Sequence, residues 1–271
     1  MVETASAAPA TQQQSDNKDQ WSSQKYDKHA SFVPALGAPV LRLLDPKPHE
    51  RILDLGAGDG VLTVELQKQC QSVVAVDASA DMISAAQQIG CKDARVVDGH
   101  DLVDDQELAS GQFDAVFSNA ALHWMKRDPQ RVVEGVYKCL KPSGRFVAEC
   151  GGYMNCSEVR TGLHAALKKR GHNPEDYDPW FFPGTKTYTR MLEQQGFRVD
   201  SIELIPRLTP LNTDIKGWIE TFGFTFMKPF EGDEETQREI REEVQNNLKF
   251  SQDDGVWSIM YVRLRFKATK I

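Results

Sequence analysis

Residues 52–60 read Ile-Leu-Asp-Leu-Gly-Ala-Gly-Asp-Gly, and this stretch decides the fold class. Its first four residues are mostly apolar, as in a buried strand, and three alternating glycines then lead into a helical pattern that begins near Val61. Glycine adopts positive φ angles without strain and lets a ligand lie against bare backbone. The N-terminus of the following helix favours a negatively charged group. The stretch therefore predicts a strand, a ligand-binding loop and a helix.

Asp77 indicates what kind of ligand the loop binds. It lies seventeen residues after Gly60, at the end of the next strand-like run, where a carboxylate can accept hydrogen bonds from both hydroxyls of a ribose. A dinucleotide loop prefers the spacing Gly-x-Gly-x-x-Gly, but the place of its third glycine is taken here by Val61. The observed spacing, with Asp54 before it, instead resembles motif I of the S-adenosylmethionine-dependent methyltransferases.

The pattern around this loop predicts an α/β fold. Short β-branched runs alternate with helix-length amphipathic segments, which is typical of a parallel sheet covered by helices. The expected strands of this part are 51–55, 72–77, 94–98, 113–118 and 144–150. Their carboxyl ends meet at one edge, where open parallel sheets bind ligands. Asp98 ends the third of these strands and has two open interpretations, an acceptor for an adenine amino group or a turn-forming Asp-Gly.

The chain resembles a class I S-adenosylmethionine-dependent methyltransferase of the group that includes trans-aconitate methyltransferase. The resemblance rests on residues 52–60, 76–82, 113–124 and 140–145, and it extends from about residue 21 onward. It implies a Rossmann-like sheet of seven mostly parallel strands, helices on both faces, a helical lid and an antiparallel last strand, here 256–267. In that last strand, apolar residues alternate with Tyr261, Arg263 and Arg265.

The same resemblance implies S-adenosyl-L-methionine as the cofactor and assigns residues to its parts. They lie in the glycine loop and at the ends of the next three strands. They are, for the methionine part, Asp54, Gly56, Asn119 and Ala120; for the ribose, Asp77, with Met82 against a face of the ribose or adenine; for the adenine, Asp98 and Gly99; and, elsewhere in these loops, Ala57, Gly58, Gly60 and Ala78.

His123 and Trp124 are the expected catalytic residues. The step Leu122-His123-Trp124 is similar to one in methyltransferases of small acids, where these groups meet the acceptor carboxyl. The resemblance thus favours O-methylation of a carboxylate on a small, trans-aconitate-like acid, which is already ionised and needs a clamp rather than a base. His123 either faces the ligand as a donor or is a hydrogen-bonded residue at a strand end. Trp124 is interpreted first as a packing wall.

Other functions stay open at this point. An N-methyltransferase or hydroxyl O-methyltransferase of secondary metabolism would use His123 or a tyrosine of the lid as its base. A methyltransferase-like protein could also act through partners without catalysis. Tyr137 and Lys141 have the spacing of a short-chain dehydrogenase dyad, but Lys141 directly precedes Pro142 at an expected helix end, and the glycine spacing disfavours that class.

Composition narrows the partners of the 271-residue chain. The formal charge of −7 argues against nucleic acid as a partner, and no apolar run approaches the roughly 18–20 residues of a membrane span. Residues 231–254 hold nine acidic and three basic residues, so the rest of the chain is nearly neutral. Five scattered cysteines indicate free thiols, a cytoplasmic location and no metal site. We expect a small-molecule acceptor, no membrane partner, and a monomer or weak homodimer.

The domain organisation follows from the same pattern. Residues 1–20 are expected to form a disordered tail and residues 21–271 a single methyltransferase domain, with a cofactor-binding core over about 49–150. The expected lid segments are about 151–186 and 208–255. Trp21 and Tyr26 either fold over the cofactor or plug the sheet edge. A basic set on one expected helix is interpreted as a solvated face; it comprises Arg160, Lys168, Lys169 and Arg170.

Overall fold

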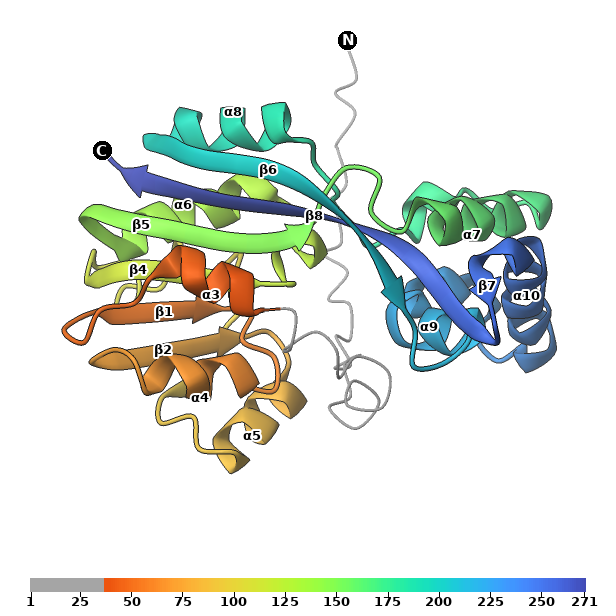
Figure 1. The fold of residues 1–271 in the computed structure, drawn as a ribbon, viewed down its shortest axis with the longest axis horizontal. Coiled ribbons are helices and arrows are strands. Elements are labelled where there is room, and N and C mark those ends of the chain that lie inside the picture. The colour runs from red at the N-terminus through yellow and green to blue at the C-terminus, as the bar shows by residue number, and fades with distance from the viewer. Residues whose placement is uncertain (1–36) are drawn as a thin grey trace, which may run out of the picture.

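The computed structural model describes residues 37–271, which form a twisted sheet with helices on both faces (Figure 1). The strand order is β3-β2-β1-β4-β5-β8-β6, and the two-residue strand β7 pairs with β8 off this path. The pairs from β3 to β5 are parallel, whereas β8 runs antiparallel to both β5 and β6. The strands are β1 Arg51–Leu55, β2 Ser72–Asp77, β3 Ala94–Val96, β4 Phe113–Asn119, β5 Leu140–Gly151, β6 Phe197–Pro210, β7 Gln252–Asp253 and β8 Val256–Lys270. The predicted Rossmann-like architecture with an antiparallel last strand is confirmed.

The helices alternate with the strands in the first half of the chain and cluster in the second. The α-helices are α3 Ala38–Leu44, α4 Val61–Gln67, α5 Ala80–Gln88, α6 Pro129–Cys139, α7 Ser157–Lys169, α8 Thr185–Gln195, α9 Ile215–Phe222 and α10 Glu234–Asn247. Short 3₁₀ helices are η1 Leu122–Trp124, η2 Pro174–Asp176, η3 Phe224–Phe230 and η4 Lys249–Ser251. Side-chain caps fix several helix starts; Ser79, for example, accepts from the backbone N–H of Met82 at the start of α5.

Alternate strand residues build the cores on the two faces of the sheet. Leu53 of β1 packs with Val136 of α6 and Leu192 of α8 in one buried cluster. Its neighbour Ile52 packs with Leu66 of α4 on the opposite face. This period of two is what a strand buried on both faces requires.

The strands predicted to end at residues 118, 150 and 267 run on to Asn119, Gly151 and Lys270, and two other limits differ for local reasons. The third strand ends at Val96 instead of residue 98, because the carboxylate of Asp98 accepts the backbone N–H of His100 (2.9 Å) and turns the chain. The fifth begins at Leu140 instead of residue 144, because a register shift against β4 lets Pro142 lie within the strand.

A third hydrophobic cluster lies among α7, α9, α10 and β8, and Figure 1 shows these helices around the carboxyl end of β6 and the amino end of β8. It joins Leu163 of α7, Trp218 of α9, Ile240 of α10 and Ile259 of β8, all of them buried. The helices α7, α9 and α10 fall within the predicted lid segments, whereas β8 follows them, and the action of the helices as a lid over an acceptor stays a prediction.

The basic residues of α7 correct one interpretation. The Nε of Arg160 contacts the fully buried carboxylate of Asp178 (2.5 Å), and Arg170 pairs with Glu243 of α10 (3.0 Å). The solvated-face interpretation is therefore wrong for Arg160 and Arg170, because acidic residues distant in the sequence fold against them. Lys168 and Lys169 are exposed.

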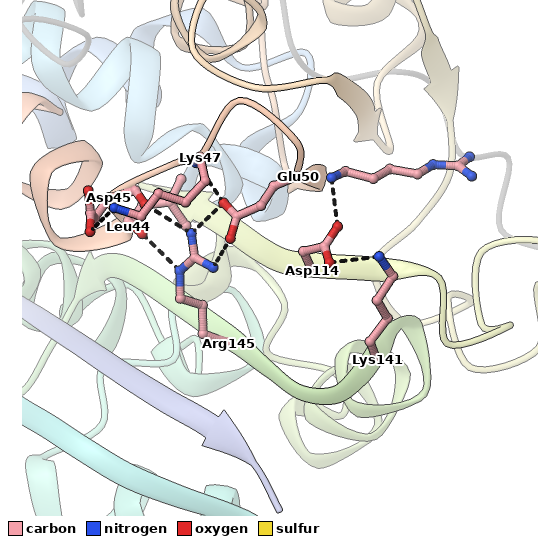
Figure 2. Close-up of polar contacts among 8 residues, drawn as sticks. Leu44, Asp45, Lys47, Glu50, Asp114, Lys141 and Arg145 are labelled. Carbon is pink, nitrogen blue, oxygen red and sulfur yellow. Dashed lines mark hydrogen bonds and ion pairs between the residues drawn. The ribbon is translucent and has the colours of Figure 1, made fainter.

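A polar cluster joins the amino ends of β1 and β5 (Figure 2). The guanidinium of Arg145 donates to both carboxylate oxygens of Glu50 (2.6 and 2.8 Å) and to the carbonyl oxygens of Leu44 and Asp45. Burial raises the pKa of Glu50, but hydrogen bonds from Arg145 and from the backbone of Lys47 outweigh it and hold the pKa below its usual value. We call this group the Arg145–Glu50 cluster.

The expected tail over residues 1–20, together with Trp21 and Tyr26, lies outside the described residues. Within residues 37–271, no helix combines the length and apolar character that crossing a membrane requires. All five cysteines are free, and four of them are buried, as the sequence indicates.

Candidate active site

A cavity of about 300 Å³ lies at the carboxyl edge of the parallel strands. The loops after β1 to β4 form one side, and residues from β5, β6, β8 and α9 form the other. Ten of the twelve predicted cofactor-binding residues and both predicted catalytic residues line it. These are Gly56, Ala57, Gly58, Asp77, Ala78, Met82, Asp98, Gly99, Asn119, Ala120, His123 and Trp124.

The glycine loop is anchored under the cavity by its backbone. The N–H groups of Gly56 and Ala57 both donate to the carbonyl oxygen of Val76 (2.8 and 3.0 Å). A Cβ on Gly56 would lie 2.2 Å from the Cβ of Ala121, so this glycine is needed for packing. At Gly58, by contrast, a Cβ would meet nothing within 4 Å of it, although φ is +58°. Gly58 therefore presents bare backbone to open space, which fits a ligand lying against the loop.

Asp54 and Gly60 lie beneath the loop and do not line the cavity. The hydroxyl of Thr63 donates to the buried carboxylate of Asp54 (2.7 Å). Burial, with the nearby charge of Asp77, raises the pKa of Asp54 to about 7. A Cβ on Gly60 would lie 2.5 Å from the Sγ of Cys91, so this glycine allows the loop to pack on α5 and the segment after it.

Asp77 stands at the cavity wall in a fixed orientation. Its Oδ2 accepts from the backbone N–H of Gly58, and its Oδ1 from that of Ser79, both at 2.9 Å. The carboxylate thus couples the glycine loop to the start of α5, next to Met82. A carboxylate fixed in this way suits the recognition of ribose hydroxyls.

The structure shows the turn interpretation of Asp98, and its role as an acceptor for adenine stays a prediction. It forms the turn described above and also lines the cavity. Hydrogen bonds from the ring and backbone of His100 outweigh burial and lower the pKa of Asp98 to about 2. The Nδ1 of His100 lies 2.6 Å from Asp98, while its buried Nε2 has no hydrogen-bond partner among the described residues. His100 lines the cavity too, and sequence reasoning did not select it.

Asn119 and Ala120 close the end of β4 against β5. Asn119 lies in register with Glu149 of β5, and the N–H of Ala120 donates to the carbonyl of Glu149 (2.7 Å). Ala120 has a φ of +58°, a conformation that a side chain disfavours, and such strained positions cluster at ligand sites.

His123 is a buried, neutral donor at the cavity wall. Its Nδ1 accepts the backbone N–H of Gly151 (3.2 Å), so the ring proton resides on Nε2. Burial, together with the positive charge of Arg263, holds the pKa of His123 well below its usual value. His123 thus lines the cavity and is hydrogen-bonded, and its contact with a ligand stays a prediction.

Trp124 belongs to an aromatic wall that also includes Trp180 and Phe182. The rings of Trp124 and Trp180 meet edge to face with centroids 6.0 Å apart, and Trp180 stacks on Phe182 at 5.6 Å. His123 adjoins the same wall, 5.7 Å from Phe182. All four line the cavity, so its middle is apolar.

Two cavity residues that the sequence did not reveal as functional are Arg207 of β6 and Arg263 of β8. Arg207 donates to the Oε1 of Glu149 (3.1 Å), and the Nε of Arg263 is 3.4 Å from the same atom. Arg265 donates to Oε2 (2.8 Å). Three arginines therefore share one buried carboxylate; we call this group the Glu149 cluster.

The strand order, the glycine loop and the acidic strand ends define a nucleoside-binding α/β protein. A family model described as a methyltransferase domain matches residues 53–148. An uncharacterized methyltransferase of Schizosaccharomyces pombe is 44% identical over 261 residues, which cover 93% of this chain and 99% of that protein. A trans-aconitate 2-methyltransferase of Deinococcus radiodurans is 33% identical over 123 residues, 44% of this chain and 45% of that one.

A solved structure extends the likeness to the fold. Phosphoethanolamine N-methyltransferase 2 of Haemonchus contortus, in complex with S-adenosylhomocysteine and phosphomonomethylethanolamine, superposes with a TM-score of 0.55 at 18% identity, covering 91% of this chain and 57% of that one. The chain belongs to the methyltransferase family. It is an S-adenosylmethionine-dependent methyltransferase, which disfavours the dehydrogenase alternative.

Proposed function

We propose that this methyltransferase esterifies a carboxylate of a small organic acid. The observation that carries the proposal is the state of His123. Its Nδ1 lone pair is used by Gly151, its Nε2 carries the proton, and its pKa lies well below the usual value, so it is a donor and not a base at neutral pH. A carboxylate acceptor needs a donor of this kind and no base.

The chemistry follows from charge. Bound S-adenosylmethionine supplies a methyl group on a positively charged sulfur, and an acceptor carboxylate, ionised at neutral pH, displaces that sulfur in line. We propose that the Nε2–H of His123 orients the acceptor oxygen, and that the wall of Trp124, Trp180 and Phe182 excludes water. Positioning and exclusion of water then supply most of the rate enhancement.

Amine or hydroxyl acceptors are the alternative, and they would need a base at the site. Glu149 is held by arginines, and the hydroxyl oxygen of Tyr261 accepts from Trp218 (2.7 Å). Both groups are already engaged in these contacts, so neither is well placed to remove a proton from an amine or hydroxyl acceptor. The partial likeness to trans-aconitate 2-methyltransferase gives the acid acceptor further support.

We propose that the cofactor lies along the glycine loop, with Gly58 against its backbone-facing side. Asp77 and Met82 would hold the ribose, Asp98 and Gly99 the adenine, and Asn119 and Ala120 the methionine end. In this arrangement Asp54 would act on the methionine end from beneath the loop and not by lining the cavity. The helices α7, α9 and α10 would cover the acceptor as a lid on a single domain.

We propose a cytoplasmic setting for the reaction. The five free cysteines support a reducing location, and the cavity of about 300 Å³ supports a small-molecule acceptor. A monomer or weak homodimer remains our expectation.

The test is product identification. The full chain is incubated with methyl-labelled S-adenosylmethionine and matched panels of small acids, amines and phenols, and labelled products are identified by mass spectrometry. We expect labelled esters that mild alkali hydrolyses. A labelled product that survives alkali, formed from an amine or phenol, would overturn the acid acceptor.

A further inference from the structure

The Glu149 cluster carries more positive than negative charge. Arg207, Arg263 and Arg265 contact one carboxylate, that of Glu149, whose side chain is 2% exposed. Glu203 is the other acid near this group, 4.0 Å from Arg265, but it is largely exposed to solvent. Burial lowers the pKa of Arg207, yet a guanidinium stays protonated near neutral pH. The described residues of this cluster therefore carry a net positive charge.

Two donors of the cluster lack acceptors. The Nε atoms of Arg207 and Arg263 are buried and have no hydrogen-bond partner among the described residues. Arg263 contacts Glu149 at ion-pair distance without the geometry of a hydrogen bond. Buried donors in native proteins nearly always have a partner, so two guanidinium groups with unused donors beside the cavity support an anion bound there.

The strand register explains why both arginines face the same space. On β8, residues 261, 263 and 265 lie on one face, and Arg207 of β6 pairs with Tyr261 while Arg263 pairs with Ile205. Arg207, Tyr261 and Arg263 all line the cavity, together with Thr209 and Trp218. The arrangement is rigid, because both arginines project from paired strands and share Glu149.

We propose that Arg207 and Arg263 form an anchor for a non-reacting carboxylate of the acceptor, and that Glu149 positions the two arginines. The inference rests on the proposed acid acceptor. A carboxylate neutralised by two guanidinium groups is a poor nucleophile, because its charge is held in ion pairs. The carboxylate that attacks is therefore a second one, which the Nε2–H of His123 orients. The acceptor then carries at least two acid groups.

The test compares diacids with monoacids of equal length. Succinate, glutarate and adipate are titrated calorimetrically into the full chain saturated with S-adenosylhomocysteine, and butanoate, pentanoate and hexanoate serve as matched monoacids. At least one diacid is expected to bind tenfold or more tightly than its monoacid. Arg207→Gln and Arg263→Gln should each remove most of that preference. If no diacid is preferred, or if both variants keep the preference, the anchor is excluded.

Controls separate folding and function from recognition. Arg198→Gln changes an exposed arginine that lies on β6, as Arg207 does, and pairs with Asp200. This variant should keep the preference for the diacid over its monoacid. Unchanged affinity for S-adenosylhomocysteine shows that a variant is folded; Arg207 is less buried than Arg263, so it remains informative if Arg263→Gln does not fold.

Glu149 is tested as a positioning residue by its conservative variant. Glu149→Gln should raise KM for the preferred diacid more than it lowers kcat, and Glu149→Asp should restore part of the loss. Equal effects on KM and kcat in both variants would exclude the positioning role. The binding test is independent of the reaction: arginine-dependent diacid binding without ester formation contradicts only the proposed function, whereas ester formation without arginine dependence contradicts only the anchor.

Discussion

Charged residues are buried near both ends of strands β1 and β5, but they are paired differently at the two ends. At the amino ends, Glu50 and Arg145 form a bidentate ion pair whose remaining donors reach backbone carbonyls (Figure 2). At the carboxyl ends, four residues further along each strand, Asp54 has no cationic partner among the described residues, and Glu149 has three. The positive and negative side-chain charges match at the amino ends, and they do not match at the carboxyl ends.

The pKa values of two acids on the same strand region express this difference. Both Glu50 and Asp54 are buried, but ion pairing lowers the pKa of Glu50, whereas burial raises the pKa of Asp54 to about 7. Burial alone therefore does not mark a functional residue. A buried charged group without an opposite charge beside it is a better candidate for a functional residue, because a ligand can supply the missing charge. In this protein the negative excess lies under the glycine loop and the positive excess lies at the proposed acceptor end.

The largest expected effect on stability comes from removing the ion pair of the Arg145–Glu50 cluster. Arg145→Gln leaves Glu50 buried without its counter-charge, and we expect the free energy of unfolding to fall by about 3–5 kcal/mol. Urea unfolding followed by circular dichroism measures the change. The exposed pair of Arg198 and Asp200 supplies the control: Arg198→Gln should lose less than about 1 kcal/mol. Similar small losses in both variants would contradict the comparison.

The next effect has the opposite sign and depends on pH. In the folded protein the pKa of Asp54 is raised from 3.8 to about 7, so folding favours the protonated carboxyl. The folded protein therefore loses stability as the pH rises from about 4 through 7 and the buried carboxyl ionises. Asp54→Asn should therefore stabilise the cofactor-free protein at pH 8 by about 2–4 kcal/mol, with a gain that shrinks toward pH 4. Thermal and urea unfolding across this range measure it, and a gain that does not vary with pH would show that Asp54 is not strained by its charge.

Sequence reasoning found most of the cavity residues that we assign to the cofactor, because they are local in the sequence; their contacts with the cofactor stay a prediction. The glycine loop, Asp77 and Asp98 follow their strands directly, and the parallel arrangement brings them to one edge. The acceptor side is not local. Arg207 and Arg263 come from β6 and β8, and the alternation in β8 made Arg263 look like a polar, outward residue, although the structure buries it beside Glu149.

The sequence around α7 also gave a wrong interpretation, because the partners of its arginines are distant in the sequence. Arg160 and Arg170 look solvated in a basic helical turn, and only the fold supplies Asp178 and Glu243 as their partners. His100 could have been suspected from its place directly after Asp98 and Gly99. Its orphaned Nε2 becomes visible only when burial is known.

A third prediction concerns the cofactor. Asp77→Ala removes the carboxylate that fixes Gly58 and Ser79 and that we assign to the ribose. We expect the affinity for S-adenosylhomocysteine to fall tenfold or more, equivalent to about 1.4 kcal/mol or more. Calorimetric titration measures it, with the exposed Asp253→Ala as the matched acidic control. Unchanged affinity in the Asp77 variant would show that the ribose lies elsewhere.

A smaller effect is expected at His123, which orients the acceptor in our proposal. His123→Ala should lower kcat about three- to tenfold, or about 0.7–1.4 kcal/mol, while leaving the affinity for S-adenosylhomocysteine within twofold. Steady-state kinetics with the acid found in the product screen, together with calorimetry, separate the two quantities. Equal losses of turnover and cofactor affinity would place His123 in the cofactor pocket instead.

The smallest expected effect is the response of turnover to pH, and it separates acid acceptors from those that need a base. Burial and the charge of Arg263 keep His123 neutral through the neutral range, and a carboxylate acceptor is ionised above a pH of about 5. With both substrates saturating, kcat should stay within twofold between about pH 6.5 and 8.5. His123→Gln should lower the whole profile without bending it, since it removes a donor and no titrating group. A wild-type kcat that rises about tenfold per pH unit would reveal a proton leaving the acceptor or a base, and would favour an amine or hydroxyl in place of the acid.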